Sequence, residues 1–375
     1  MAIEIREVTS GKHLREFIRF PYRLYKDNPY WVPPLDFDEK STLTHGKNPA
    51  LSFCDFKMWM AYKDNRPVGR IAGIINHKAN EIWQEKHARF GWIDFDDDEE
   101  VSALLFKTIE EWAIAHKMEA VHGPLGFTDF DKEGMLIEGF SELGTMATNY
   151  NHPYYPVHTE LAGYQKDTDW IEFEVRVPEG VPEKHRRISE LALRRNNLTL
   201  YTAKTSKQIL PYASQIFDLI NLAYKDLYGF VPVTDKQKEY YTKTYFSFIK
   251  AEYVPIILNK DNKVVGFGIT MPSLSKALQK AKGKLFPFGF FYLLKAMRNN
   301  DRVDFYLMAV APELQNKGVN AALFTDLIPK YINARVKFAE TNIELEDNQK
   351  VTSQWEYFDR RMHKKRRAYI KHLLK

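Results

Sequence analysis

The chain has 375 residues, enough for two domains of ordinary size, and a formal net charge of +5. Its single cysteine, Cys54, excludes an intrachain disulfide and a cysteine-rich metal site and favours a reducing compartment, so we expect a cytoplasmic protein. No stretch approaches the roughly 20 apolar residues of a transmembrane helix, and the N-terminus lacks the apolar core of a signal peptide. The basic residues that follow Asp359 are interpreted as a solvated charged face, so we do not expect nucleic acid as a partner.

The first half of the chain alternates patterns of strands and helices. Apolar and charged side chains alternate at the N-terminus and again in the run WIEFEVRV, which is typical of strands with one buried face. Strands are predicted at residues 3–8, 57–62, 68–76, 90–95, 120–123 and 170–177, and helices at 13–25 and 101–117.

The second half repeats this order of elements. A break at residues 178–182 and a helix at 183–195 suggest an N-terminal domain at 1–178, a linker helix at 179–197 and a C-terminal domain at 198–375. Strands are predicted at 198–202, 254–258, 264–271, 303–310, 338–345 and 367–373. Helices are predicted at 209–227, 236–249, from 319 onward and at 349–362, and an insertion at 272–300. The shared order indicates a duplicated α/β fold, each copy a mixed sheet flanked by helices.

The stretch from Arg302 to Lys330 combines an apolar strand, a short polar loop with Gly318, and the start of a helix. Strand, tight loop and helix can direct several backbone N–H groups at an anion, and the helix dipole favours negative charge there. This stretch is therefore a candidate phosphate-binding loop. A plain strand-to-helix connection is the alternative.

The loop Gln315-Asn316-Lys317-Gly318-Val319-Asn320-Ala321 resembles the acyl-CoA loop of the GNAT superfamily of N-acyltransferases, which reads Arg/Gln-x-x-Gly-x-Gly/Ala. Gln315 and Gly318 match, whereas Asn320 stands where the family has a small residue. The wider chain resembles uncharacterised bacterial proteins with two GNAT-like domains in tandem. The segments that carry this resemblance are 25–35, 66–76, 90–100, 123–140, 150–155 and 228–234.

The resemblance implies two tandem acyl-CoA N-acyltransferase-like domains, with the active site in the second. It implies acetyl-CoA or another acyl-CoA as a substrate and a small-molecule or peptide amine as the acceptor. The strand would supply backbone groups to the pantetheine arm, with the Val310 amide as oxyanion donor, and the loop would hold the pyrophosphate. The residues implied in acyl-CoA binding are Met308, Ala309, Val310, Gln315, Asn316, Lys317, Gly318, Val319, Asn320 and Ala321.

Acyl transfer to an amine also needs a base, and the departing thiolate benefits from an acid. Glu340 and Glu344 are predicted on one face of the strand 338–345, and Asp304 is a further candidate base on the neighbouring strand. Solvent-facing carboxylates are the alternative. The family's acidic tyrosine falls at Trp355 by position, so the nearby phenols Tyr357 and Tyr369 are the candidate acids, with Tyr357 preferred. The histidines lack metal-ligand spacing, and no metal is expected.

Two further segments bear on function. Residues 94–100 hold six acids in the loop equivalent to the acyl-CoA loop, which indicates a degenerate first domain whose acids serve helix capping and solubility. The insertion 272–300 mixes lysines with aromatic residues. It is interpreted as a lid for an acyl chain or anionic substrate, as a membrane contact, or as a helix that packs onto the first domain.

Three functions remain open at this point. The first is an acyl-CoA-dependent N-acyltransferase. The second is a non-catalytic binding or regulatory protein on the same fold. The third is a transferase that depends on aminoacyl-tRNA, since peptide-bridge-forming enzymes also pair two such domains. We expect a monomer or a homodimer.

Overall fold

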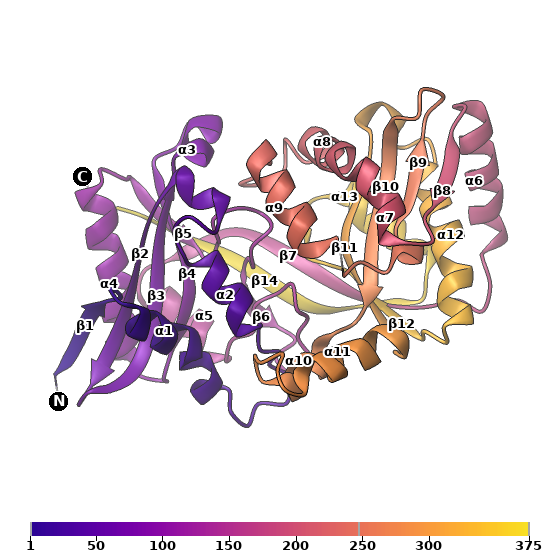
Figure 1. Cartoon of the computed structure of the whole chain (residues 1–375). Helices are drawn as coiled ribbons and strands as arrows, with labels where there is room; N and C mark the ends of the chain where they lie inside the picture. The colour runs from indigo at the N-terminus through magenta and orange to yellow at the C-terminus, as the bar shows by residue number, and fades with distance from the viewer. Residues whose placement is uncertain (1, 247, 374–375) are drawn as a thin grey trace. The chain divides into compact units, whose positions relative to one another are not determined.

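The computed structural model describes residues 2–246 and 248–373 (Figure 1). Its backbone divides into two compact units, each assembled from separated parts of the sequence. Unit 1 comprises Met1–Ile171, Ser275–Tyr292 and His363–Lys375, and unit 2 comprises Glu172–Leu274 and Leu293–Met362.

These units differ from the ranges expected from the sequence in three places. The helix of the expected linker belongs to unit 2, most of the insertion belongs to unit 1, and so does the C-terminal strand.

Unit 1 contains a mixed sheet in the order β1-β2-β3-β4-β5-β14, with β6 also paired to β14. All of its strand pairs are antiparallel except β4 with β5, which is parallel. The strands are β1 (Ile3–Glu7), β2 (Cys54–Lys63), β3 (Arg66–Asn76), β4 (His87–Phe95), β5 (Ala120–Gly123), β6 (Met135–Glu138) and β14 (Arg360–His372).

Helices cover both faces of this sheet, and each face has its own apolar core. One core joins Leu105 and Ile109 of α4 to alternate residues of the strands, among them Ile71 and Ile75. The other core joins Phe17 of α1 to the β3 side chains that point to the opposite face, among them Ile74. Successive side chains of a strand point to opposite faces, so an almost wholly apolar β3 serves both cores.

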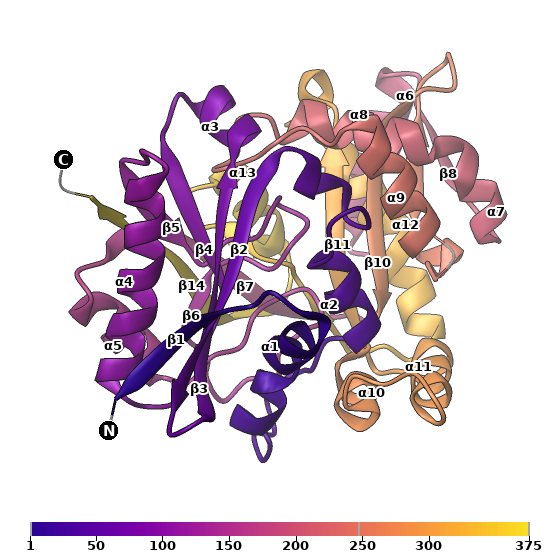
Figure 2. The ribbon, with the colours of Figure 1, turned by 60° about the vertical axis from the view of Figure 1, so that its left-hand side comes forward.

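The helices of unit 1 are α1 (Gly11–Leu24), α2 (Asp36–Thr42), α3 (His77–Trp83), α4 (Glu99–Ala115), α5 (Tyr154–Leu161), α10 (Ser275–Ala281) and the start of α11 (Gly289–Arg298). Figure 2 shows α1 and α4 against the strands of this sheet.

Unit 2 has the same plan, with the strand order β7-β12-β11-β10-β9-β8 and β13 paired to β7. Here too one central pair, β11 with β12, is parallel. The strands are β7 (Gln165–Arg176, in unit 2 from Glu172), β8 (Thr199–Thr202), β9 (Pro255–Leu258), β10 (Val264–Pro272), β11 (Arg302–Val310), β12 (Phe338–Glu340) and β13 (Glu344–Leu345). The helices are α6 (Glu183–Arg195), α7 (Ser206–Ile209), α8 (Ala213–Ala223), α9 (Asp235–Tyr245), α12 (Val319–Asn333) and α13 (Gln349–Thr352).

Two predicted elements of unit 2 are wrong in extent. The strand predicted at 338–345 is two short strands, β12 and β13, because the chain leaves β11 after Glu340. The helix predicted at 349–362 is a single turn, α13, followed by a 3₁₀ turn (Ser353–Tyr357). Packing shortens the predicted helix 349–362, because Trp355 is buried against Phe305 and Phe324 and the chain then enters β14.

Candidate functional site

The strand β11 separates from its parallel neighbour halfway along its length. Pairing with β12 covers Arg302 to Asp304 on β11, and no strand of the described residues pairs with β11 on that side beyond this point. On the other side β11 continues along β10 to Val310, with one irregularity. Ile269 of β10 faces Leu307 and Thr270 faces Phe305, so Tyr306 is an extra residue, a β-bulge. The last half of β11 thus has one edge without a paired strand.

The bulge decides which backbone groups point to that edge. Beyond it, the Ala311 N–H donates to the Val265 carbonyl at 2.8 Å, so odd-numbered residues direct their backbone groups at β10. The even-numbered residues Tyr306, Met308 and Val310 therefore direct theirs at the unpaired edge. We call this edge, with the side chains around it, the β11 gap.

Side chains satisfy the carbonyl groups of the β11 gap. The Tyr306 carbonyl accepts from Asn342 Nδ2 at 3.0 Å, the Met308 carbonyl from the Tyr224 hydroxyl at 2.9 Å, and the Val310 carbonyl from Gln315 Nε2 at 3.2 Å. The amide N–H groups of Met308 and Val310 point the same way by strand geometry. They offer two donors in a row to an extended ligand.

The loop that follows leads directly into a helix N-terminus. A 3₁₀ turn (Pro312–Leu314) is followed by two residues with left-handed backbone, Asn316 (φ 60°) and Gly318 (φ 78°). Gly318 is the N-cap of α12, and no side chain caps the helix. The N–H groups of Val319 and Asn320 have no acceptor within the helix, as in any first turn. They and the helix dipole form a site for an anion next to the end of the β11 gap.

Glycine is required at position 318 for two reasons. Its positive φ strains any residue with a side chain. A Cβ there would also lie 2.4 Å from Cγ2 of Ile188, on the helix α6 that packs against α12 (Figure 1). The sequence matches Gly318 to the glycine of the family loop, and the structure places it at a positive φ.

Glu344 borders the β11 gap and carries an unusual pKa. Burial raises the pKa of its carboxyl group to about 8, although the Trp355 indole N–H, which donates to Oε1 at 2.7 Å, and Arg360 act to lower it. Tyr224 lies within electrostatic reach. Burial raises its pKa to about 12, the hydrogen bond to Met308 lowers it, and the charge of Glu344 raises it further. Glu344, whose carboxyl pKa is raised, thus interacts with the phenol that binds the Met308 carbonyl.

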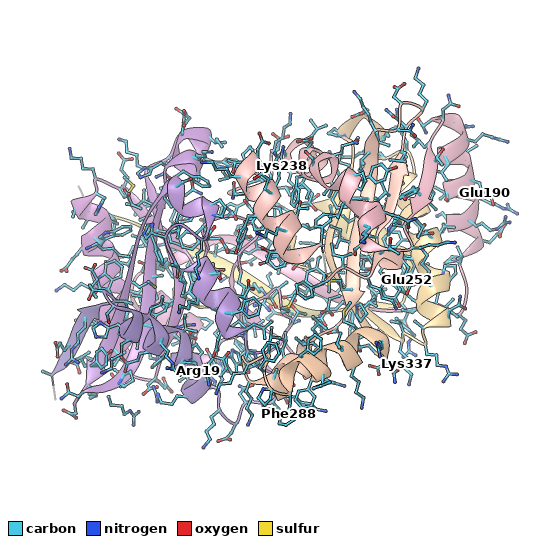
Figure 3. All side chains as sticks on the ribbon, in the orientation of Figure 1. Arg19, Glu190, Lys238, Glu252, Phe288 and Lys337 are labelled. Carbon is cyan, nitrogen blue, oxygen red and sulfur yellow. The ribbon has the colours of Figure 1, made fainter. Side chains whose placement is uncertain are left out.

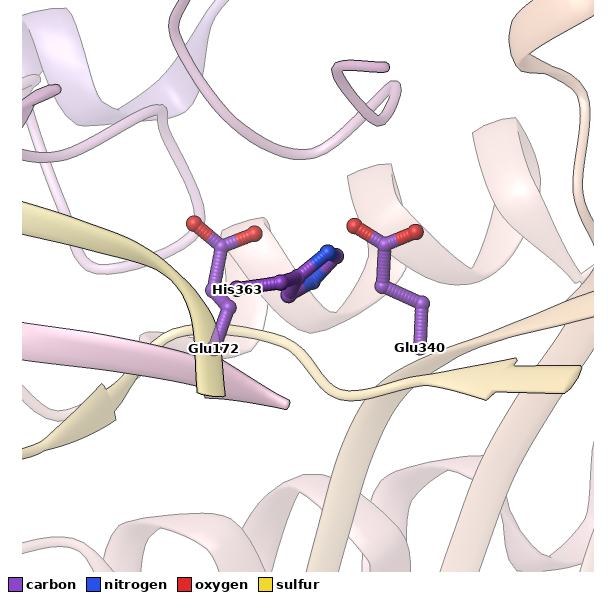
Figure 4. Close-up of side chains that lie close together, drawn as sticks. All are labelled: Glu172, Glu340 and His363. Carbon is purple, nitrogen blue, oxygen red and sulfur yellow. The ribbon is translucent and has the colours of Figure 1, made fainter. Parts of the chain in front are cut away.

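Glu340 lies in a different place, among buried acids on one face of the sheet. Asp304 faces Glu340 across the parallel pair, and Glu174 faces it across β7, so Glu172 shares the same face two residues along. All four carboxyl groups are buried, and oxygen atoms of Glu172 and Glu340 lie within 4.8 Å of each other (Figure 4). We call Asp304, Glu172 and Glu340 the acidic cluster. His363, also drawn in Figure 4, clusters with unit 1, where its Nδ1 lies 3.5 Å from Glu142 Oε2.

Two neighbours of the acidic cluster, Glu174 and Tyr306, have pKa values that are shifted in opposite directions. Burial acts to raise the pKa of Glu174, but hydrogen bonds from Arg361 and Arg302 outweigh it and lower that pKa. Tyr306 shows the opposite effect, because burial first and then the charges of Asp304 and Glu340 hold its pKa well above the ordinary value. Four buried carboxyl groups thus share this face, and two arginines bind one of them, Glu174.

The structure separates the three predicted catalytic residues. The expectation that Glu340 and Glu344 share one strand face is wrong, because β12 ends at Glu340 and Glu344 begins β13. Tyr357 is 55% exposed, and its ring lies against Lys184 and His185 of α6. The phenol at the β11 gap is Tyr224 instead. Sequence reasoning missed it, although it continues the apolar face of Ile216 and Ile220 in the predicted helix 209–227.

The equivalent loop of unit 1 is occupied by the chain itself. Asp98 caps α4 by accepting from the N–H groups of Glu100 and Val101 at 3.1 and 3.4 Å, and its other oxygen binds Lys63 at 2.8 Å. The prediction that these acids serve capping is confirmed for Asp98. No corresponding carboxylate caps α12.

Two curated proteins match most of the chain at modest identity. Protein YghO of Escherichia coli K12 is 26% identical over 387 residues, covering 98% of this chain and 95% of that protein. A bacterial ceramide synthase of Caulobacter vibrioides is 25% identical over 299 residues, covering 78% of this chain and 76% of that protein. No family model matches the chain.

Solved structures match the architecture over nearly the whole chain. A tandem GNAT protein from the clavulanic acid biosynthesis pathway superposes with a TM-score of 0.57 at 11% identity, covering 99% of this chain and 98% of that one. A GCN5-related N-acetyltransferase from Sphaerobacter thermophilus gives a TM-score of 0.53 at 9% identity, covering 99% and 95%. Both matches bear on the fold, and with the two mixed sheets described above they show that this chain has a tandem GNAT fold.

Proposed function

We propose that this chain is an acyl-CoA-dependent N-acyltransferase whose active site lies in unit 2. One observation supports it above all. The unpaired edge of β11 presents the N–H groups of Met308 and Val310 in a row, and the uncapped start of α12 follows directly. A pantetheine arm with a pyrophosphate at its end has amide carbonyls and an anion in that same sequence.

The proposed binding residues divide between the two parts of this ligand. Met308, Ala309 and Val310 would pair with the pantetheine arm, and the loop from Gln315 to Ala321 would hold the pyrophosphate. Asn316 and Lys317 are exposed, so the Lys317 ammonium is available to a phosphate. Asn320 would contribute its backbone N–H, for which the nature of its side chain is secondary.

The proposed reaction starts with attack of a neutral amine on the thioester carbonyl carbon. A C–N bond forms, and the oxyanion accepts from the Val310 N–H. The Glu344 carboxylate takes the proton from the amine nitrogen. The C–S bond then breaks, and the thiolate receives that proton, which leaves an amide, free CoA and the Glu344 carboxylate. A carboxyl pKa of about 8 lies close to that of a thiol, about 8.5, so Glu344 suits both transfers.

Glu340 would act on the acceptor rather than on the thioester. The acidic cluster places three carboxyl groups on one buried face, and an ammonium group is the form in which most amines approach at neutral pH. We propose that Glu340, with Asp304 and Glu172, attracts the amine of a small molecule or peptide before it loses a proton.

The name of one relative suggests substrates with long hydrocarbon chains. A ceramide is an amide between a fatty acid and a long-chain amine, and one relative is named a ceramide synthase. We therefore include long-chain acyl-CoA donors and long-chain amino alcohols among the substrates to be tested.

Calorimetry with acetyl-CoA and with palmitoyl-CoA tests the binding step on the full chain. Binding to the wild type and its loss in Gly318→Trp are the expected results. Gly180→Trp is the matched control, because nothing lies within 4 Å of a Cβ at that position in the same unit. Absence of binding to either thioester by the wild type contradicts the proposal.

A transfer assay tests the chemistry. Release of free CoA in the presence of an amine is expected from the wild type, with a loss of about 10²-fold or more in kcat for Glu344→Gln and intact thioester binding. Binding of acyl-CoA without transfer to any amine would favour the alternative, a binding or regulatory protein on this fold.

A further inference from the structure

The segment that joins α10 to α11 carries a dense group of exposed aromatic side chains. Phe286 is 77% exposed, and Phe288 and Phe291 are each 63% exposed. Figure 3 labels Phe288 at the outer end of this segment. The exposed apolar residues here are Phe286, Phe288, Phe290, Phe291, Tyr292 and Leu294. We call them the aromatic tip. A run of this kind on a folded protein marks a surface that meets another phase or molecule.

The aromatic tip lies in a stretch of sequence that is rich in basic residues and holds no acidic residue. Residues 275–298 contain no aspartate or glutamate. Their basic residues are Lys276, Lys280, Lys282, Lys284, Lys295 and Arg298. Lys282 and Lys284 are exposed directly before the first phenylalanine, and no ion pair of the described residues involves any of the six cations. The segment therefore places exposed lysines next to exposed aromatic side chains in the sequence.

Unit 1 holds the base of this segment firmly in place. Gln279 Nε2 donates to the carbonyls of Pro29 and Trp31 at 2.8 and 3.0 Å. The Gly283 carbonyl accepts from the Asp36 N–H at 2.9 Å, and a Cβ at Gly283 would lie 1.9 Å from the Tyr22 hydroxyl oxygen. The packing of the insertion onto the N-terminal residues, one of its three interpretations, is thus present in unit 1. It forms a rigid base from which the aromatic side chains project.

We propose that the aromatic tip docks on the surface of an anionic lipid bilayer. Phenylalanine side chains favour the boundary between headgroups and acyl chains, and lysines favour the negative surface potential of anionic lipids. A protein partner fits less well, because the cores of protein interfaces are depleted in lysine. No helix of the described chain is long and apolar enough to cross the bilayer, so the contact is peripheral. This inference does not depend on the proposed reaction.

Flotation of the full chain with lipid vesicles tests the proposal. Binding is expected to vesicles of phosphatidylcholine mixed with phosphatidylglycerol, and not to phosphatidylcholine alone. The triple variant Phe286→Ser, Phe288→Ser, Phe291→Ser is expected to lose roughly tenfold or more of the bound fraction. The double variant Lys282→Glu, Lys284→Glu is expected to lose a similar amount, and added salt should weaken wild-type binding.

Matched variants elsewhere on the surface separate the tip from general effects. Phe248→Ser removes a phenylalanine that is 65% exposed, and Lys204→Glu with Lys207→Glu makes the same charge change away from the tip. Both are expected to bind like the wild type. Failure of the wild type to bind anionic vesicles overturns the proposal, and so does equal loss in the controls. A dimer in sedimentation that the triple variant abolishes, without vesicle binding, would assign the tip to a second copy of the chain instead.

Discussion

The connections β4–α4 of unit 1 and β11–α12 of unit 2 share a backbone plan but differ in what occupies it. Each strand has a parallel partner for only three residue pairs and an irregular register against the strand before it. In unit 1 the Leu125 N–H donates to the Phe90 carbonyl at 2.8 Å, just where β4 leaves β5. Hydroxyl groups of Tyr154 and Tyr155 bind the carbonyl and the N–H of Phe95 further along.

In unit 1 the chain itself thus fills the two places that neither a paired strand nor a capping side chain of the described residues fills in unit 2. A peptide segment lies beside the strand, and the Asp98 carboxylate lies on the helix amides. Both units share the sheet and the irregular strand register. The proposed capacity of unit 2 for a ligand therefore depends on the few residues that follow β11.

Gly318→Ala should have the largest effect. We expect a loss of about 2 to 5 kcal/mol in the free energy of unfolding, because left-handed strain adds to the overlap with Ile188. Urea denaturation measures it, with Gly180→Ala as the control. A change below 1 kcal/mol would mean that the loop relaxes without strain and that glycine is not required there.

Glu344 should make stability depend on pH. Its pKa is raised from 4.5 to about 8 in the folded state, so its contribution is fully present below about pH 4.5 and declines as the pH rises through 8. Relative to Glu344→Gln, the wild type should lose on the order of 2 to 3 kcal/mol between pH 5 and pH 8. Denaturant melts of the two proteins at several pH values test this. A parallel pair of curves would contradict the raised pKa.

Asp98→Ala should destabilise unit 1 without opening it to a ligand. Loss of the helix cap is expected to reduce the free energy of unfolding by about 1 to 2 kcal/mol. The α4 amides become available, but the segment at Leu125 still lies beside β4, so calorimetry should detect no additional acyl-CoA site. A second site of similar affinity in this variant would show that the cap alone distinguishes the two units.

Tyr224→Phe should have the smallest effect. Removal of the hydroxyl leaves the Met308 carbonyl without that donor, and we expect a loss of about 0.5 to 1.5 kcal/mol by thermal or urea unfolding. Tyr357→Phe, the tyrosine favoured by the sequence, lies exposed and should be neutral within about 0.5 kcal/mol. If Tyr357→Phe lowers the free energy of unfolding and Tyr224→Phe does not, Tyr357 rather than Tyr224 supports the site.

Local patterns predicted much of the fold. The alternation in WIEFEVRV and the strand, loop and helix pattern from Arg302 to Lys330 are short-range signals, and the corresponding elements lie where expected. The special backbone of Gly318 was also predictable, because few residues other than glycine adopt a positive φ at a helix start.

Contacts between distant segments account for what the sequence could not show. Glu340 and Glu344 differ in environment because β12 ends where β11 diverges from it. The extent of β12 depends on its pairing with β11 and β7 and not on local propensity. Tyr224 reaches Met308 from a helix 84 residues upstream. The pKa of Glu344 depends on burial near Trp355, which no spacing rule contains.

The C-terminal strand has a consequence for how the chain is made. Residues 369–372 of β14 pair with β5 of unit 1, so the sheet of unit 1 gains this strand only after all of unit 2 has been synthesised. Such distant pairing slows folding and leaves the edge of β5 exposed on the nascent chain. A fragment cut at residue 178 or 197 would lack β14, and we expect it to associate or to recruit a chaperone at that edge rather than fold as an independent domain.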